Sequence, residues 1–404
     1  MDFRIGYLAR LAMELATGAA GFSPEFRRHW RCFVKRFVAP NGGFMGRSPV
    51  TNEAKTGKIA PPIADAYYTS FGLRCLAMLG ADDPETTEII NGCSDFLQHV
   101  VRRSDDLLDE PTNILTSDFW CDEPLASLTA WFQSAAMIDA MTGRFPVTAA
   151  TRCEWFEQRI APLRRLDGGF ALTPESPESS TYATFLVLST AELTDLALAP
   201  LSSSQTLPKN RFSIHCEKIA AMLADRQNVD GGFSEIASLG RSGTNPTAAA
   251  IALLRMIDER TNSDDHKNTG EYANMYSSVS VKDIIQSGVL GGMRYLLSSK
   301  THDGGFPAHP QLPLADLLSS LTAMVALRDI KWLARLGTAR FTELQRRKIA
   351  RMISDVHTPL RRFAESLETP DGGFRSVAID TGTDVEYTFY GLAIRAFTAP
   401  AGTE

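Results

Sequence analysis

A short phrase recurs along most of this sequence. Asp-Gly-Gly-Phe ends at Phe170, Phe233, Phe306 and Phe374, and an Asn-Gly-Gly-Phe version ends at Phe44. The phenylalanines lie 126, 63, 73 and 68 residues apart, and the first interval is twice the second, so a degenerate copy is expected between the first two. The 404 residues therefore divide into six repeats of roughly sixty residues, and a period of this length constrains the fold more than any single residue does.

Each repeat has the same layout: an amphipathic helix, the Gly-Gly-Phe turn, a polar loop and a second, more apolar helix. Residues 212–226 and 247–257 are examples of the two helices. Glycine supplies the left-handed backbone that ends a helix. Amphipathic helices suit an outer layer and apolar helices an inner one. We therefore expect a single domain over residues 1–404, a closed double ring whose repeats span approximately 25–80, 82–142, 150–197, 212–258, 284–330 and 340–398.

The composition excludes several classes of function. A net charge of −6 gives no electrostatic support for a nucleic-acid partner, and no window approaches eighteen consecutive apolar residues, so we expect no transmembrane segment. The first eighteen residues are amphipathic and charged, which is not the pattern of a signal peptide. The six cysteines are scattered without a C-x-x-C pair, which favours reduced thiols and a cytoplasmic location.

The repeat resembles a known superfamily. The segment Gln227-x-x-x-Gly231-x-Phe233 is similar to the Q-x-x-x-G-x-W/F motif of squalene and oxidosqualene cyclases. The alternation of Gly-Gly-Phe turns with apolar helices resembles the β-subunits of protein prenyltransferases. Both belong to the α-α toroid superfamily, and the resemblance covers about residues 25–398. It implies an all-α, α6-α6 toroid of six inner and six outer helices around an apolar cavity suited to an isoprenoid chain.

The first repeat resembles one prenyltransferase segment in particular. The residues from Gly42 to Arg47, followed after a loop by Asp65-Ala-Tyr-Tyr68, are similar to G-G-F-x-G-R…D-x-C-Y. In that family the Arg, the final Tyr and a loop Lys contact the isoprenoid diphosphate. The resemblance implies that Arg47, Tyr68 and Lys58 (or Lys55) bind a diphosphate, which Mg²⁺ would accompany. The alternative is that Arg47 is a solvated loop residue and Tyr68 a core aromatic.

The zinc site of the prenyltransferases is not matched. Asp65 is kept, but Tyr67 stands at the Cys ligand, and Tyr387 stands at the His ligand in the phrase that matches H-T-x-F-G. Tyrosine replaces neither a thiolate nor an imidazole well, so we expect no zinc. The histidines do not compensate, because His29, His99 and His215 fall in expected outer helices and His266, His302, His309 and His357 in loops or helix starts.

The sixth repeat resembles a different active site. Asp384-Val-Glu386-Tyr387-Thr is similar to the D-x-D-D-T-A phrase with which class II terpene cyclases protonate an alkene, and Glu386 stands at the central acid. Such chemistry needs a buried, protonated carboxyl group facing aromatic walls that stabilise a carbocation. The candidates for those walls are Tyr67, Phe71, Phe389 and Tyr390.

The aspartates also have a structural interpretation. Asp65, Asp122, Asp316 and Asp384 recur just before the inner helices, where an N-cap accepts hydrogen bonds from backbone donors. Capping is favoured over catalysis for any one of them. If the first and last inner helices are neighbours, residues Asp65, Tyr67, Tyr68, Glu386 and Tyr387 should converge at one rim.

The leading hypothesis is an isoprenoid-metabolism enzyme that holds a polyprenyl or terpenoid small molecule in its cavity. Its catalytic candidates are Glu386, Asp384 and Asp65, and its substrate-binding candidates are Arg47, Lys58, Tyr67, Tyr68, Tyr387 and Tyr390. The alternative is a non-catalytic toroid that binds protein or lipid, or that pairs with a helical protein partner.

Overall fold

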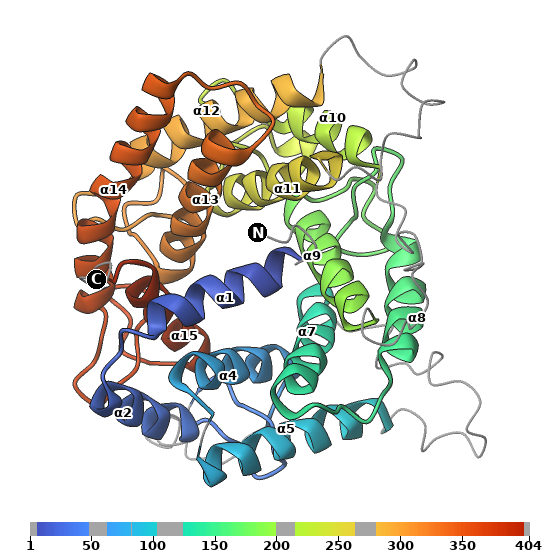
Figure 1. Ribbon diagram of the computed structural model, residues 1–404, viewed down its shortest axis with the longest axis vertical. Helices are drawn as coiled ribbons and strands as arrows, with labels where there is room; N and C mark the ends of the chain where they lie inside the picture. Colours follow the sequence, from blue (N-terminus) through green and yellow to red (C-terminus); the bar gives the residue numbers. More distant parts are fainter. Residues whose placement is uncertain are drawn as a thin grey trace. The chain divides into compact units, whose positions relative to one another are not determined.

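The protein is helical throughout the part that the structure describes. The computed structural model describes residues 6–47, 63–81, 83–102, 124–198, 215–262 and 280–399. Within them, the sequence order gives one leading helix and six helix pairs (Figure 1). The leading helix is α1 (Tyr7–Ala19). The pairs are α2 (Pro24–Lys35) with α4 (Ala66–Leu79), α5 (Pro84–Arg102) with α7 (Leu125–Thr142), α8 (Ala149–Ile160) with α9 (Thr181–Leu198), α10 (Cys216–Arg226) with α11 (Thr244–Asn262), α12 (Val281–Ser299) with α13 (Leu317–Leu336), and α14 (Glu343–Ser366) with α15 (Val385–Phe397).

The chain forms two compact units. One, here called the end unit, comprises Gly6–Pro162, Leu188–Arg211 and Ala364–Glu404, and it joins the first and last parts of the chain. Within it the apolar helices α7 and α15 both pack against α4. Helices α2 and α5 pack on the outer side of these inner helices. The other, here called the middle unit, contains Leu163–Val187 and Phe212–Phe363. In it α11 packs against α13, and α10 and α12 cover them.

The Gly-Gly-Phe turns have the conformation that the sequence predicts. The first glycine of each copy has a positive φ, from 87° at Gly168 to 96° at Gly42. At Gly231 a side chain would also lie 2.5 Å from the carbonyl oxygen of Gly291, so that position excludes any other residue twice over. The phenylalanine that follows is at most 2% exposed in every copy. The turn therefore fixes the backbone and anchors it with one buried ring.

In four of the turns a hydroxyl group connects the turn to its inner helix. The backbone N–H groups of Phe44, Phe170, Phe233 and Phe306 each donate to a threonine or serine hydroxyl at 2.9 Å, and these hydroxyls belong to Thr69, Thr184, Thr247 and Ser320. All four lie at the same place in the first turn of an inner helix. Because the phenylalanine is buried, its N–H needs such a partner.

Neighbouring repeats are joined by one recurring backbone bond. In the middle unit, Thr181 N–H donates to the carbonyl oxygen of Glu235 at 2.9 Å, and Thr244 N–H donates to that of Ala308 at 2.8 Å. In the end unit the equivalent bond runs from Val385 N–H to Gly46 O at 3.1 Å. The sixth repeat is thus attached to the first in the way that the third is attached to the fourth.

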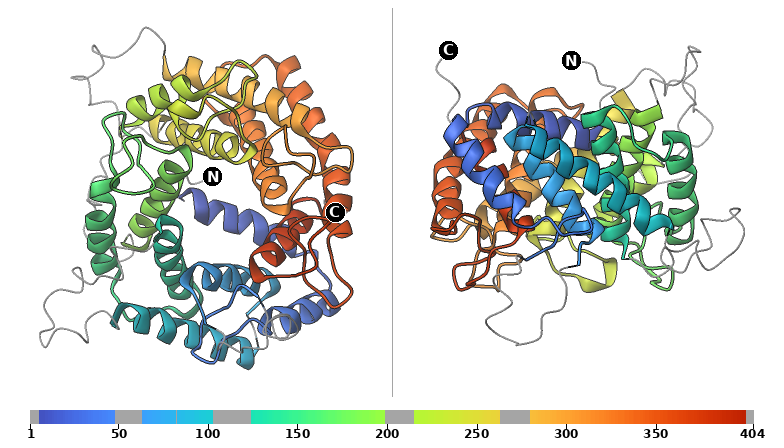
Figure 2. Two further views of the ribbon diagram at one scale, coloured as in Figure 1. Left: turned by 180° about the vertical axis from the view of Figure 1, so that it is seen from behind. Right: turned by 90° about the horizontal axis from the view of Figure 1, so that it is seen from below.

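Helix α1 lies outside the six pairs and was not predicted as a packed element. It lies against α15 and α4 in the end unit (Figure 2). The N–H of Tyr7 donates to the Glu192 carboxylate at 2.8 Å, and Gly18 approaches the backbone of Ala396 so closely that a Cβ there would lie 2.2 Å from the carbonyl oxygen. Ala396 lies in the last turn of α15 and Glu192 in the second half of α9, so α1 packs toward the carboxyl-terminal parts of inner helices.

Three local predictions were wrong. His357 lies in the second half of α14, which runs from Glu343 to Ser366 with Pro359 inside it, and not in a loop or at a helix start. His215 lies just before α10, which begins at Cys216, and not inside the expected outer helix. At α7 the N-cap is Pro124, which makes no side-chain cap, and Asp122 lies outside the described residues.

No helix in the described ranges combines the length and apolar character that crossing a membrane would require.

Candidate functional site

The last repeat meets the first at the amino-terminal ends of α15 and α4. Arg47 and Asp384 form an antiparallel bridge there, next to the Val385–Gly46 bond. This junction brings together residues more than 300 positions apart in the sequence. The predicted convergence of Asp65, Tyr67, Tyr68, Glu386 and Tyr387 is confirmed as a spatial arrangement.

The aspartates at this rim are N-caps, as predicted. Asp65 accepts from the N–H of Tyr68 at 3.1 Å, and Asp384 accepts from the N–H of Tyr387 at 2.7 Å. Asp316 has the same role at α13, where it accepts from Ser319 at 2.7 Å. Each bond satisfies a donor that the start of a helix leaves without an intrahelical partner.

Glu386 differs from these aspartates because its carboxylate is held by side chains. Its Oε1 accepts the hydroxyl of Tyr67 from α4 at 2.7 Å and the hydroxyl of Tyr390 from its own helix at 2.7 Å. The pair of bonds fixes the direction of the side chain and ties α15 to α4. Among the described rim residues, Glu386 is the one whose carboxylate accepts two phenol hydroxyls on a single oxygen atom.

The tyrosines belong to a continuous aromatic group, here called the rim cluster. Its rings are those of Tyr67, Tyr68, Phe71, Tyr387, Phe389 and Tyr390, whose neighbouring centroids lie 5.0 to 5.9 Å apart. Most pairs are edge-to-face, the arrangement that the charge distribution of aromatic rings favours. Within the cluster, Phe71, Phe389 and Tyr390 are buried. Tyr67, Tyr68 and Tyr387 are partly exposed.

A guanidinium group already lies on the inner side of the rim cluster. The Cζ of Arg74 lies 5.1 Å from the centroid of Phe71 and 5.6 Å from that of Phe389. Arg74 also donates to Gln133 of α7, whose amide donates to Thr190 at 2.9 Å. Phe71 and Phe389 were predicted as walls that stabilise a carbocation. In the structure the Arg74 guanidinium already lies over both rings.

The rim carries more negative than positive charge. Burial and the neighbouring charges of Glu386, Asp384 and Asp65 raise the pKa of the Tyr68 phenol, and Arg47 opposes them only in part. Asp384 is 8% exposed, and burial, with a further contribution from the charge of Glu386, raises its pKa to about 7, although the Tyr387 N–H and Arg47 act in the opposite direction. At a second carboxylate, Asp380, burial acts to raise the pKa, but hydrogen bonds from the Gly382 N–H and the Ser376 hydroxyl, with the charge of Arg47, hold this pKa below its usual range.

Some predicted site residues are not part of this geometry. Lys58 and Lys55 lie outside the described residues. Arg47 is exposed and adjoins carboxylates, a setting that favours an ion pair over an anionic ligand. Within the described ranges, no three His, Cys, Asp or Glu side chains are grouped so that they could hold a metal ion.

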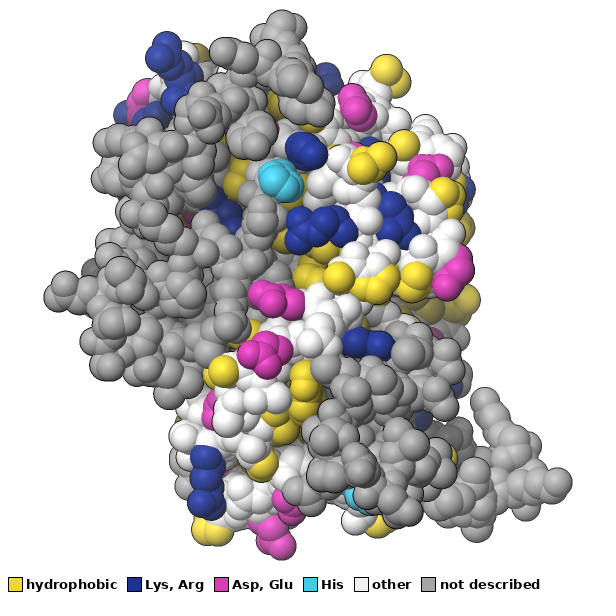
Figure 3. Space-filling view, turned by 90° about the vertical axis from the view of Figure 1, so that its right-hand side faces the viewer, with side chains coloured by type: hydrophobic (Ala, Val, Ile, Leu, Met, Phe, Trp, Pro, Cys, Tyr) yellow, Lys and Arg dark blue, Asp and Glu magenta, His cyan; other side chains and the backbone are white. Residues whose placement is uncertain are grey.

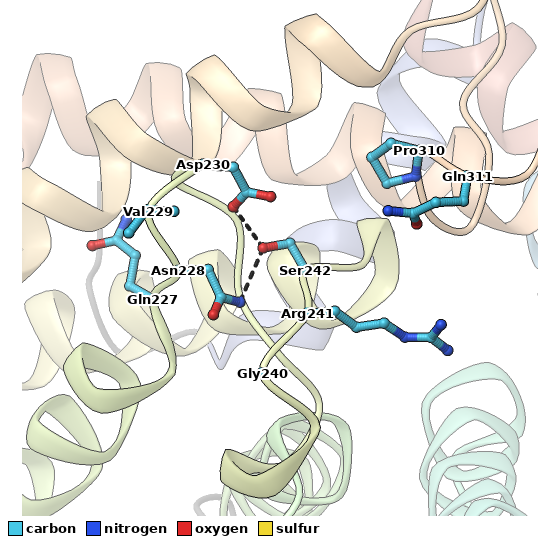
Figure 4. A pocket seen from close by; sticks show the side chains of 9 residues that line it. All are labelled: Gln227, Asn228, Val229, Asp230, Gly240, Arg241, Ser242, Pro310 and Gln311. Carbon is cyan, nitrogen blue, oxygen red and sulfur yellow. Dashed lines mark hydrogen bonds between the residues drawn. The ribbon is translucent and has the colours of Figure 1, made fainter.

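A separate hollow lies in the middle unit, on the turn of the fourth repeat. It has a volume of about 520 Å³ and lies between the Gln227–Asp230 turn, the loop at Gly240–Ser242, and Pro310 with Gln311 (Figure 4). Ser242 donates to Asp230 at 2.7 Å and accepts from Asn228 at 3.0 Å. Asn228, Asp230 and Ser242 hydrogen-bond to one another, so their role here is to hold the turn together. We therefore do not treat this hollow as the functional site.

Sequence reasoning did not identify two features of the site. Arg74 was not singled out, although an arginine inside an apolar helix is a signal for a buried cation with aromatic partners. The hydroxyls at Thr69 and its equivalents were also missed, and their recurrence four residues after the helix-capping position could have indicated them.

Comparison with known proteins agrees with this fold. The chain matches the model of the prenyltransferase alpha-alpha toroid domain over residues 4–283 and 291–401. The protein belongs to the prenyltransferase alpha-alpha toroid family. Its fold class is thus the all-α toroid that the repeats predicted, and terpene cyclases and protein prenyltransferases are among the structures that resemble this toroid protein.

Solved structures similar to this toroid protein have different functions. An α-1,6-mannanase of Salegentibacter sp. HEL1_6 has 13% identity and a TM-score of 0.51, with 98% of this chain and 99% of that chain covered. The Candida albicans protein geranylgeranyltransferase-I has 12% identity and a TM-score of 0.49, covering 91% and 90%. The type II terpene cyclase MstE from Scytonema, in complex with its product merosterolic acid A, has 10% identity and a TM-score of 0.48, covering 97% and 98%. No match was found among curated proteins. At these identities the likeness concerns the fold alone.

Proposed function

We propose that this toroid protein is an enzyme of isoprenoid metabolism that protonates a polyprenyl or terpenoid substrate at the rim formed by α15 and α4. Glu386 is the acid and Asp384 its carboxyl neighbour. The observation that carries the proposal is the pair of tyrosine hydroxyls on one oxygen of Glu386, beside the rim cluster.

The arrangement positions one carboxyl group for proton transfer to an alkene, and a substrate bound over the partly exposed rim would supply the burial that this chemistry needs. Oε1 of Glu386 accepts both tyrosine hydroxyls, so the proton of the neutral acid would be carried by Oε2. This proton would pass to an alkene carbon, the π electrons would form the new C–H bond, and the positive charge would remain on the adjacent carbon. The proton released when the final cation becomes an alkene would restore the acid. Asp384, whose pKa is raised to about 7 by burial and in part by the charge of Glu386, would take up or release a proton near neutral pH.

The charges at the rim favour this reaction over diphosphate chemistry. A carbocation gains from aromatic faces and from nearby carboxylates. A diphosphate at Arg47 and Tyr68 would meet the carboxylates of Asp65, Asp384 and Glu386, and like charges at short range are unfavourable. We therefore place the diphosphate-binding role of Arg47 second, and no step of the proposal passes through Mg²⁺ or zinc.

The test is turnover of a panel of linear polyenes and prenyl diphosphates, with cyclised products identified by gas chromatography and mass spectrometry. Glu386→Gln should reduce conversion by about 10²–10⁴-fold, the range that general acid catalysis contributes. Glu217→Gln is a matched control, because Glu217 is also the second residue of a helix but belongs to α10 in the middle unit. Failure of every polyene, or equal turnover by the two variants, would reject the proposal.

The second candidate is a non-catalytic toroid that binds a protein or a lipid. It is supported by the capping role of Asp65 and Asp384, which accounts for two of the three catalytic candidates without chemistry. On the face that Figure 3 presents, however, the hydrophobic side chains of described residues lie in small groups among charged residues of both signs. A protein-docking surface is expected to have a larger continuous apolar area than these groups.

A further inference from the structure

Positive charge is concentrated in one segment of the middle unit. Residues 328–362 contain ten Lys or Arg and three Asp or Glu, whereas the whole chain has a net charge of −6. The segment covers the end of α13, the connection at 337–342 and most of α14. A chain that is acidic as a whole therefore carries one strongly basic region, and such a separation of charge creates a local field that attracts anions.

Six of these basic residues lie at the surface around the connection between α13 and α14. They are here called the basic face, and they are Arg335, Arg340, Arg346, Arg347, Lys348 and Arg351, all of them exposed. Glu343 is the one carboxylate between positions 335 and 351, and it bonds to Arg347 at 2.9 Å. With 78% of the Arg347 side chain exposed, this pair is of the weak surface kind and leaves the arginine available to another anion.

The fold holds the basic face in place. Phe341 is 6% exposed and anchors the connection, whereas Arg340 next to it is exposed. On α14 the buried Ile349 stands two positions after Arg347 and two before Arg351, so both arginines point to the opposite side of the helix. The charges are thus presented together where α13 ends and α14 begins.

The positive field also acts inside the unit. His357 lies half-buried on α14, and burial together with the charges of Arg328 and Lys331 on α13 lowers its pKa. A histidine gains a proton less readily where positive charge is near. At this position the positive charges therefore outweigh the negative ones.

Two aliphatic side chains stand among these charges. Leu336, the last residue of α13, is 56% exposed, and Leu344, the second residue of α14, is 78% exposed. Contact of such side chains with water is unfavourable, and the outer layer of a bilayer offers an apolar region for leucine as well as phosphate groups for arginine. A nucleic acid offers phosphate groups without an apolar layer. The leucines therefore favour a lipid surface as the occupant of the basic face.

We propose that the basic face is a docking surface for a membrane with anionic phospholipids, into whose head-group layer Leu336 and Leu344 insert. The guanidinium fork of arginine fits phosphate oxygens in pairs, and each Lys or Arg near an anionic bilayer strengthens binding by about fivefold. The protein would lie on the membrane and be held mainly by charge, because two leucines bury too little apolar surface to hold it on a neutral bilayer. The inference goes beyond the proposed function, since none of these residues belongs to the rim of α15 and α4.

The test is co-sedimentation of the full-length protein with vesicles of two compositions. One contains phosphatidylcholine alone, and the other contains phosphatidylcholine with phosphatidylserine. Partition into the anionic vesicles should be at least about tenfold stronger, and it should weaken as salt is added, because exposed charges are screened. A parallel arm titrates labelled polyuridylate RNA, which carries phosphate groups but has no apolar layer.

A matched pair of double variants locates the surface. Arg340→Glu with Lys348→Glu reverses two charges of the basic face and should weaken binding to anionic vesicles by at least about hundredfold. Lys282→Glu with Arg294→Glu changes the net charge equally, but these exposed residues belong to α12, so binding should stay within about twofold of the wild type. Leu344→Ser should weaken binding by about fivefold without a change of charge. Circular dichroism and urea unfolding verify that each variant is folded.

Equal partition into neutral and anionic vesicles would overturn the inference, as would equal binding by the two double variants. Unchanged binding by Leu344→Ser would reject insertion of the leucines. Absence of sedimentation with either vesicle would also overturn the inference, and RNA binding that only the basic-face variant abolishes would then assign the face to a nucleic acid. Every readout is a binding measurement, so the result is independent of the polyene test at Glu386.

Discussion

Replacement of Thr184 by valine tests a hydroxyl that connects a turn to its inner helix. Thr184 Oγ1 accepts the N–H of Phe170 at 2.9 Å and donates to the carbonyl oxygen of Ser180 at 2.7 Å, and all three residues are at most 2% exposed. Valine has nearly the same shape, so no cavity forms. It leaves the buried Phe170 N–H without a partner, which costs about 1–3 kcal/mol, whereas Ser180 O keeps its bond from the Thr184 N–H. We expect a loss of about 2 kcal/mol in the free energy of unfolding.

Urea denaturation measures this loss as a lower midpoint at an unchanged m-value. Thr247→Val should have the same effect, because Thr247 accepts the N–H of Phe233 at 2.9 Å in the next repeat. Thr17→Val is the matched control, because its hydroxyl donates to the Met13 carbonyl oxygen at 2.8 Å at an exposed position of α1. The control should change stability by less than about 0.5 kcal/mol. A loss for Thr184→Val no greater than that of the control would refute the reasoning.

Three further predictions concern pH, close packing and a buried cation. The pKa of Asp384 is raised from 3.8 to about 7 in the folded protein, so its contribution to stability is fully present below about pH 4 and is lost as the pH rises to about 7, at up to about 1.4 kcal/mol per pH unit. The variant Asp384→Asn keeps a capping side chain but cannot ionise, so the urea midpoint should depend less on pH between about pH 4 and pH 7. An unchanged slope would contradict this assignment. Gly18→Val should loosen α1 from the backbone of α15 and so increase proteolysis within α1. Gly21→Val is the control and should not, because its added Cβ would have no neighbour closer than 3.6 Å. Equal cleavage of the two variants would count against close packing of α1 on α15. Arg226→Met should cost roughly 3 kcal/mol, because four acceptors on Thr181, Ser179 and Glu235 lose their donor. The exposed Arg347→Met should cost less than about 0.5 kcal/mol, and similar urea midpoints for the two variants would disprove the prediction.

The repeat made the fold predictable because its signals are local. A glycine with positive φ, a buried phenylalanine and an N-cap each depend on a few neighbouring residues. For that reason the capping roles of Asp65, Asp316 and Asp384 were predicted correctly from their positions alone. The family match over nearly the whole chain agrees with the same reasoning.

Local signals failed where tertiary packing overrides them. Thr358-Pro359 indicates the end of a helix, yet α14 continues through it. Helix α1 was seen only as an amphipathic segment, because amphipathicity does not say which partner covers the apolar face. Its place on the ends of α9 and α15 depends on Glu192 and Ala396, which are distant in sequence.

The candidate site shows the same division. The sequence by itself determined that the chain forms helical repeats and which residues stand at the start of each inner helix. It also indicated that the first and sixth repeats differ from the others in their tyrosines and carboxylates. Only the tertiary structure decided that Tyr67 and Tyr390 bond to the same oxygen of Glu386 and that Arg74 lies beneath the rings. The physical reason is distance along the chain: periodicity is encoded within one repeat, whereas the chemistry of the rim depends on contacts between repeats at opposite ends of the sequence.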